Sequence, residues 1–180
     1  MVKKKILIVE GNTREENSEF TAVGINTHTE SLIESINFYK KDLDISIANP
    51  SSDNNLKNSI DSLDKYDGMI WGGSSLNIYN DTDEIRRQIS FMRECQLKIK
   101  KIFAICWGLQ VAVTVAGGQV KKSEKGAHRG IAHNIKVNNI GSNHKIYLDK
   151  KRQFNSPAFN FDEVVKIPEG ATLLSSNELN

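Results

Sequence analysis

A short apolar segment that ends at Cys106 constrains the fold of this chain more than any other feature. Residues 102–105, Ile-Phe-Ala-Ile, form an apolar run with the length and composition of a buried strand. Gly108 follows two residues after the cysteine, and the apolar positions of residues 109–116 favour a helix. A strand, a tight turn that carries a nucleophilic side chain, and a helix together form a nucleophile elbow.

The position of Cys106 favours a reactive thiol over a structural one. The N-terminus of the following helix points N–H groups at the sulfur, and this positive end stabilises the thiolate, which is the reactive form. A cysteine beside an apolar strand can instead be a small buried hydrophobe. Cys95 fits that second interpretation, because it lies at the end of an amphipathic segment with no adjacent glycine and no preceding strand.

Length and composition indicate an ordinary globular protein, and residues 1–180 are expected to form a single domain. The 24 basic and 22 acidic residues give a net charge of +2, which offers no argument for binding to nucleic acid or a membrane. The apolar run after the basic start at Met1–Lys5 is too short for a signal peptide or a membrane span. Two cysteines without framework spacing favour a reduced, cytoplasmic setting.

Strand-like and helix-like segments alternate over the first two thirds of the chain. Short runs rich in β-branched residues predict strands, and apolar residues three or four positions apart predict helices. The predicted strands are residues 5–10, 44–48, 68–71 and 102–105, and the predicted helices lie within residues 29–39, 53–67, 82–95 and 109–116. The mostly polar residues 11–24 are predicted to form a loop.

Helices between strands imply right-handed βαβ units, so the sequence predicts an α/β fold: a three-layer sandwich with a mostly parallel central sheet. Sites in such sheets form at the carboxyl ends of the strands. Residues 71–74, Trp-Gly-Gly-Ser, and residues 106–108, Cys-Trp-Gly, follow two of the predicted strands and are therefore expected at the same rim. Residues 133–137, 145–148 and 171–174 are predicted to be smaller strands added to the main sheet.

A cysteine that attacks an amide carbonyl needs N–H donors for the developing oxyanion and a group that carries the proton. Gly72 and Gly73 can adopt backbone angles that point an N–H at a ligand. In an elbow the second donor is the N–H of the residue after the nucleophile, which is Trp107. The glycine pair alone could simply turn the chain after a strand, but its combination with the elbow favours the functional interpretation.

Four stretches of the chain resemble the class I glutamine amidotransferases, in the group similar to the amidotransferase domain of GMP synthase. They are residues 6–14, residues 66–79, residues 106–111 with 116–118, and residues 162–164 with 167–172. The resemblance runs nearly end to end. Its most specific part is the Cys-Trp-Gly-Leu-Gln elbow at residues 106–110 together with the Gly-Gly loop.

This resemblance implies a flavodoxin-like fold and a cysteine-dependent glutaminase without a cofactor or a metal. Cys106 would form a γ-glutamyl thioester from L-glutamine and release ammonia, with oxyanion N–H groups from Gly73 and Trp107. Gly72 and Gln110 would contact the bound glutamine, although Gln110 could also be an ordinary exposed helical residue. Because the chain has no ATP-binding loop, use of the ammonia would require a separate synthetase partner.

The chain departs from the family pattern in its C-terminal part. It contains no His-Pro-Glu motif, which supplies the base and its orienting carboxylate in the family, so we expect a fragment with incomplete C-terminal strands. Asn160 stands where the family usually has a histidine, and Ala104 replaces a usual glycine. None of the four histidines lies on a segment expected beside Cys106, and all are interpreted as surface or loop residues: His28, His128, His133 and His144.

Two functions therefore stay open. The first is a glutamine amidotransferase whose glutaminase activity in this chain is impaired, to a level near background. The second is a non-catalytic binding or regulatory protein that retains the fold, which the change at Asn160 weakly favours. A cysteine hydrolase of the peptidase or chaperone type ranks below both, because its elbow lacks the Gly-Leu-Gln continuation of this chain.

Overall fold

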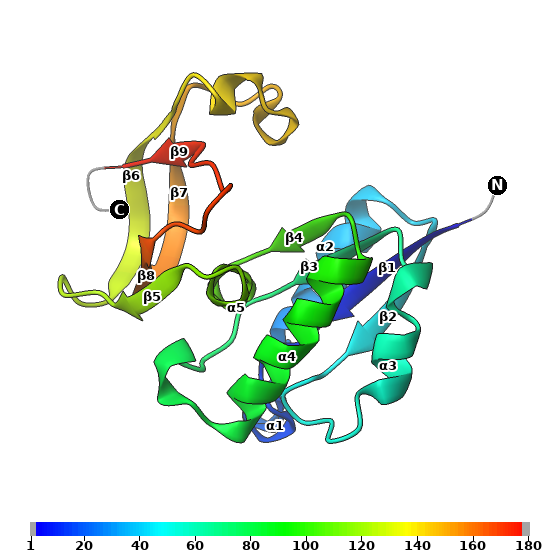
Figure 1. Cartoon of the computed structure of the whole chain (residues 1–180). Helices are drawn as coiled ribbons and strands as arrows, with labels where there is room; N and C mark the ends of the chain where they lie inside the picture. Colours follow the sequence, from blue (N-terminus) through cyan, green and yellow to red (C-terminus); the bar gives the residue numbers. More distant parts are fainter. Residues whose placement is uncertain (1–2, 178–180) are drawn as a thin grey trace. The chain divides into compact units, whose positions relative to one another are not determined.

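The computed structural model describes residues 3–177 (Figure 1). The chain divides into two compact units, Met1–Ala116 and Gly117–Asn180, and each is described by itself. That residues 1–180 together form a single domain stays a prediction.

The first unit is built on a four-stranded parallel sheet with the strand order β2-β1-β3-β4. The strands are β1 (Lys4–Val9), β2 (Leu43–Ala48), β3 (Gly68–Trp71) and β4 (Ile102–Ala104). The register pairs Val9 with both Ala48 and Trp71, and it pairs Trp71 with Ala104. All four carboxyl ends therefore finish at one edge of the sheet, and the predicted parallel sheet is confirmed.

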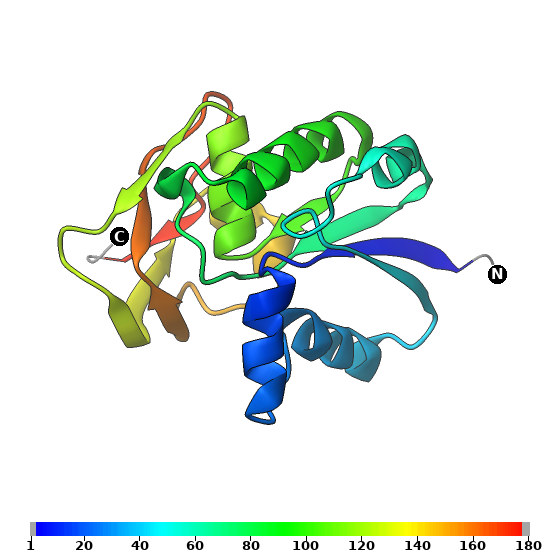
Figure 2. The ribbon, with the colours of Figure 1, turned by 90° about the horizontal axis from the view of Figure 1, so that it is seen from below.

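Helices cover both faces of this sheet. They are α1 (Arg14–Ala22), α2 (His28–Tyr39), α3 (Lys57–Asp61), α4 (Asp83–Lys98) and α5 (Trp107–Val115), with short 3-10 turns η1 (Leu63–Lys65) and η2 (Ile78–Asn80). The connection from β1 to β2 and the connection from β3 to β4 run in opposite directions along the sheet. Right-handed crossovers then put α2 and α4 on opposite faces, as Figure 2 shows. The predicted α/β sandwich is confirmed.

The polar segment 11–24 contains α1, so the prediction of a loop there is wrong. Helix α1 begins with a capping box. The Thr13 side chain accepts the Glu16 N–H, and the Glu16 carboxylate accepts the Thr13 N–H at 2.8 Å. These two hydrogen bonds satisfy backbone donors that a helix start would otherwise leave unpaired. The polar composition hid this signal, because α1 buries none of its residues.

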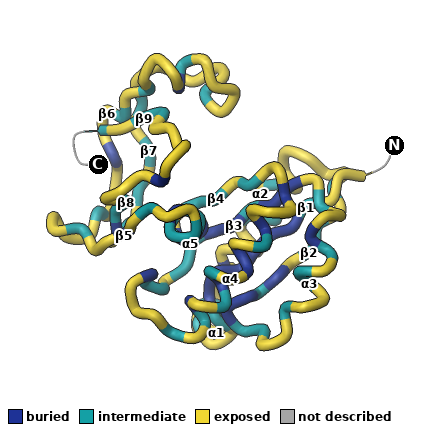
Figure 3. The backbone as a smooth tube through the Cα atoms, viewed as in Figure 1, coloured by how far each residue is buried: buried dark blue, intermediate teal, exposed yellow. Residues whose placement is uncertain are grey.

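The core of the first unit lies between the sheet and α4, where Figure 3 shows buried residues along β1, β3 and α4. Phe91 of α4 packs edge-on against Trp71 of β3, with 6.0 Å between the ring centroids, and both side chains are fully buried. Burial of a large side chain such as Phe contributes roughly 2–3 kcal/mol. The buried positions of α4 are Ile85, Gln88, Phe91, Met92 and Cys95.

The second unit contains two antiparallel sheets. In one, β5 (Gln119–Lys122) pairs with β8 (Asp162–Lys166); the other has the order β7-β6-β9, formed by β7 (Gln153–Asn160), β6 (His128–Val137) and β9 (Ser175–Ser176). The 3-10 turns η3 (Gly141–Asn143) and η4 (Lys145–Tyr147) lie between β6 and β7.

Among the helices of residues 3–177, none has the length and apolar character that a membrane crossing requires.

The strand predictions for the second unit are confirmed only in part. Residues 133–137 belong to β6, but the predicted strand at 145–148 is wrong, because residues 145–147 form η4. His144 begins this turn, and its Nδ1 accepts the Ile146 N–H at 3.2 Å. No strand spans residues 171–174. The strands form two sheets of their own rather than an extension of the parallel sheet. That the C-terminal strands are incomplete stays a prediction.

Candidate active site

Cys106 joins the end of β4 to the start of α5 in a strained backbone conformation. Its φ is 51° and its ψ is −106°, and its side chain is exposed. A residue other than glycine held at such angles costs on the order of 1–3 kcal/mol, and conformations of this kind concentrate at functional sites. Cys106 is the N-cap of α5, so the thiol stands at the positive end of that helix. The predicted strand–turn–helix elbow is present.

The elbow and the Gly72-Gly73 loop are joined by backbone hydrogen bonds. The Ile105 N–H donates to the Trp71 oxygen at 2.9 Å, which extends the pairing of β3 and β4 to the residue before the cysteine. The Gly108 N–H donates to the Gly72 oxygen at 3.1 Å. The prediction that both segments lie at the same rim is therefore confirmed.

A third loop, residues 10–13 between β1 and α1, belongs to the same rim. The sequence predicts no functional role for it. Gly11 is in close contact with both of the other loops. A Cβ built on Gly11 would lie 2.8 Å from the Gly73 oxygen and 2.8 Å from Cδ1 of Trp107. Only a residue without a side chain leaves room for this three-way approach.

The polar neighbours of Gly11 are buried and hydrogen-bonded. Asn12 donates its N–H to the Glu10 carboxylate at 2.9 Å, and its Oδ1 accepts the Ser75 N–H at 3.0 Å. Glu10 and Asn12 are both buried. Because buried polar groups are costly unless they are paired, these bonds fix the β1 loop against the segment that follows Gly73.

His28 lies beside the glycine pair, although the sequence places no histidine near Cys106. A Cβ on Gly73 would lie 3.2 Å from Nδ1 of His28, and a Cβ on Gly72 would lie 3.1 Å from Cδ1 of Leu32. Both side chains come from the first turns of α2. The Phe20 ring of α1 packs against the imidazole, with the centroids 5.8 Å apart. The other three histidines, His128, His133 and His144, belong to the second unit.

Gln110 lies in the first turns of α5, four residues after the cysteine, and is half-buried. Its Oε1 is buried and has no hydrogen-bond partner among the described residues. A buried acceptor without a donor costs about 1–3 kcal/mol. The position therefore suits a hydrogen bond from a bound molecule.

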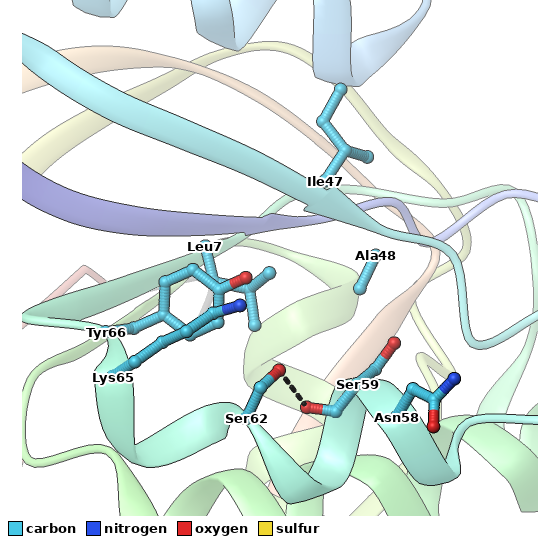
Figure 4. Close-up of a pocket in the computed structure, with 8 residues that line it drawn as sticks. All are labelled: Leu7, Ile47, Ala48, Asn58, Ser59, Ser62, Lys65 and Tyr66. Atoms are coloured by element: carbon cyan, nitrogen blue, oxygen red, sulfur yellow. Dashed lines mark hydrogen bonds between the residues drawn. The ribbon is translucent and has the colours of Figure 1, made fainter.

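Two further features do not involve the Cys106 elbow or the Gly72-Gly73 loop. Cys95 is buried in α4, and burial raises the pKa of its thiol to about 12, so it is not a nucleophile at neutral pH. A pocket of about 200 Å³ between the sheet and α3 is lined by residues that include Leu7, Ala48 and Tyr66 (Figure 4). No predicted site residue lines this pocket.

Within residues 3–177, no group of three or more His, Cys, Asp or Glu side chains could hold a metal ion.

The fold and the elbow define an α/β protein with an exposed cysteine at the carboxyl edge of a parallel sheet. The family model "Glutamine amidotransferase class-I" matches residues 25–179. The chain belongs to the class I glutamine amidotransferase family.

Two groups of curated relatives match this chain: gamma-glutamyl hydrolases and peptidases, and components of GMP synthase. A gamma-glutamyl-L-1-hydroxyisopropylamide hydrolase from Pseudomonas sp is 30% identical over an alignment that covers 98% of this chain and 60% of the relative. Gamma-glutamyl peptidase 3 from Arabidopsis thaliana is 32% identical over 65% of this chain and 48% of the relative. A glutamine-hydrolyzing GMP synthase component from Sulfolobus acidocaldarius is 27% identical over 67% of this chain and 60% of the relative. The chain thus spans about half to three fifths of the length of these relatives.

The fold agrees with a solved member of the family. The crystal structure of a glutamine amidotransferase from Thermotoga maritima matches with a TM-score of 0.72 over 99% of this chain and 69% of that chain. The sequence identity of 15% limits this likeness to the fold.

Proposed function

We propose that this chain uses Cys106 as the nucleophile on the γ-amide of a γ-glutamyl substrate. The thiolate attacks the γ-carbonyl carbon, a C–S bond forms, and the carbonyl oxygen becomes an oxyanion. The C–N bond then breaks, the departing nitrogen takes up a proton, and a γ-glutamyl thioester remains. Water hydrolyses the thioester to glutamate and restores the thiol. The strained, exposed Cys106 at the N-terminus of α5 carries this proposal.

The oxyanion is proposed to be bound by the backbone N–H groups of Gly73 and Trp107. The first N–H groups of a helix have no acceptor within the helix, and Trp107 is the first residue of α5. The next N–H, that of Gly108, already donates to the Gly72 and Ile105 oxygens. Each correctly placed donor of this kind contributes on the order of 10²–10³ in rate.

Substrate recognition is assigned to Gly72 and Gln110. The unpartnered Oε1 of Gln110 is suited to accept a hydrogen bond from the α-ammonium group of a γ-glutamyl substrate. Gly72 keeps the loop close to the elbow through its hydrogen bond with Gly108. Both residues lie in the first unit with Cys106.

The departing group distinguishes two versions of this function. With L-glutamine it is ammonia, which a synthetase partner would consume; the family and the GMP synthase relative support this version. With an N-substituted γ-glutamyl amide it is a larger amine. The hydrolase relative from Pseudomonas sp supports that version, because its match covers nearly the whole of this chain.

Proton delivery to the departing nitrogen is proposed to limit the reaction. The 180 residues contain no His-Pro-Glu sequence, and loss of one member of a catalytic triad costs on the order of 10⁴-fold or more. An amide nitrogen is a poor leaving group unless it is protonated. A nitrophenolate departs without a proton, so an activated ester tests Cys106 separately from the proton carrier.

The test mixes the protein with γ-glutamyl 4-nitrophenyl ester, L-glutamine or a γ-glutamyl alkylamide. We expect a burst of one nitrophenolate per chain, a γ-glutamyl adduct on the Cys106 peptide by mass spectrometry, and much slower turnover of both amides. The burst is lost in Cys106→Ala and retained in Cys95→Ala. If the adduct is absent while L-glutamine binding is measurable by calorimetry, the chain is a non-catalytic binding protein instead.

A further inference from the structure

Gln88 of α4 is a polar side chain in the core, directly behind the rim that carries Cys106. It is fully buried. Its Oε1 accepts the indole N–H of Trp107 at 2.8 Å, and its Nε2 donates to the Gly11 oxygen at 3.1 Å. Both ends of the amide are therefore engaged, and they engage two different loops of the rim.

The identity of the partners dictates the orientation of this amide. An indole N–H only donates and a backbone carbonyl only accepts, so Oε1 must face Trp107 and Nε2 must face Gly11. No other uncharged side chain of this size and shape offers an acceptor and a donor in the same plane. A carboxylate could accept from Trp107, but it would confront the Gly11 oxygen with a second acceptor. Glutamine at position 88 is therefore matched to the two loops that it joins.

Both hydrogen-bond partners of Gln88, Trp107 and Gly11, either provide or contact a proposed oxyanion donor. Trp107 itself provides one donor through its backbone N–H. Gly11 lies against Gly73, the residue that provides the other donor, because a Cβ on Gly11 would be only 2.8 Å from the Gly73 oxygen. The indole of Trp107 contacts Gly11 as well, with the same 2.8 Å between that Cβ position and Cδ1. Gln88, Trp107, Gly11 and Gly73 thus form one packed chain of contacts.

We infer that Gln88 is a positioning residue that holds the Gly73 and Trp107 N–H groups at the separation that an oxyanion requires. This inference rests on the proposed function. Gln88 touches neither the substrate nor the thiol and acts through Trp107 and Gly11. The effect is specific to acylation, because alkylation of the same thiol by a halide reagent develops no oxyanion.

The experiment compares two reactions of Cys106 in the full chain: acylation by γ-glutamyl 4-nitrophenyl ester and alkylation by iodoacetamide. Gln88→Met keeps the approximate volume and removes both hydrogen bonds, whereas Gln88→Glu keeps only the acceptor for Trp107. We expect acylation to slow roughly 10- to 100-fold in Gln88→Met, part of the 10²–10³ that one donor contributes, and to slow in Gln88→Glu as well, because its carboxylate faces the Gly11 oxygen. Alkylation should stay within about 2-fold of wild type in both variants, because it requires no oxyanion.

Ile85→Ala is the matched control, one turn earlier on the same buried face of α4. It destabilises the fold by cavity formation without removing a polar group, and its acylation rate should match wild type. In a Trp107→Phe background, Gln88→Met should have a smaller effect, because both changes remove the same hydrogen bond. Unfolding midpoints for every variant verify that it is folded.

The outcomes separate this inference from the proposed function. If wild-type protein is not acylated on Cys106, the proposed function and this inference both fail. If wild-type protein is acylated and both Gln88 variants are acylated as fast as wild type, only the inference fails. A parallel loss of acylation and alkylation would also overturn it, because that result would show a merely structural role.

Discussion

Gly108 of the elbow lies directly against Trp71 of the neighbouring strand: a Cβ at position 108 would be 2.6 Å from the Trp71 oxygen and 2.8 Å from the Trp71 Cβ. Real Cβ atoms do not approach backbone so closely, so Gly108→Ala must separate α5 from β3. We expect a loss of about 1–3 kcal/mol in the free energy of unfolding, measured by chemical denaturation. Leu109→Ala, at the next and half-exposed position of α5, should cost less. Equal stability of Gly108→Ala and wild type would contradict this packing.

A second prediction concerns the contact between His28 and Gly73. A methyl group at position 73 would lie 3.2 Å from Nδ1 of His28, so Gly73→Ala should lower the unfolding free energy by about 1 kcal/mol. In a His28→Ala background the added methyl group has room, and the cost should largely disappear. Contacting residues show such coupling, whereas distant residues behave additively. Additive effects in this double-mutant cycle would place His28 away from the loop.

The sequence predicts the elements that depend on local patterns and misses those that depend on contacts between distant segments. The elbow at Cys106 and the loop at Gly72 are confirmed because strand, glycine and helix signals coincide in short windows. The approach of His28 to Gly73 depends on how α2 crosses the sheet, which no local pattern specifies. Gln88 left a weak signal: it stands three residues after Ile85, on the apolar face of a predicted helix.

The backbone strain at Cys106 predicts opposite effects for two substitutions of the same residue. Alanine keeps the cost of a φ of 51°, whereas glycine adopts positive φ without penalty. Cys106→Gly should therefore be more stable than Cys106→Ala by about 1 kcal/mol in urea unfolding, although both variants lose the thiol. At Cys95, inside α4, the order should reverse, with glycine about 1 kcal/mol less stable than alanine. If alanine is more stable than glycine at both positions, the backbone at position 106 is unstrained.

The pairing of Asp67 with the start of β1 predicts a pH dependence of stability. One carboxylate oxygen accepts from the Lys4 ammonium at 2.6 Å and the other accepts the Lys5 N–H at 2.9 Å, and these bonds hold the pKa of Asp67 below its usual 3.8. A lowered folded-state pKa gives a contribution that is present above pH 3.8 and is lost as the pH falls through the folded-state value.

We therefore expect Asp67→Asn to lower the thermal midpoint at pH 7 and to differ little from wild type near pH 2. The effect at pH 7 should be small and should shrink with added salt, because the pair is exposed to solvent. Asp64→Asn, at an exposed position in η1, serves as the control and should change the midpoint less. A difference between wild type and Asp67→Asn that stays constant from pH 7 to pH 2 would exclude the carboxylate as its source.

The two cysteines should differ sharply in their reaction with an aromatic disulfide reagent. Cys106 is exposed, whereas Cys95 is fully buried and its thiol has a pKa raised to about 12. The thiolate is the reacting form, so native protein at pH 8 should release one equivalent of chromophore quickly and the second only after unfolding in guanidinium. Cys106→Ala should remove the fast phase and Cys95→Ala should leave it intact. A fast phase that persists in Cys106→Ala would show that Cys95 is accessible, against the packing of α4 on the sheet.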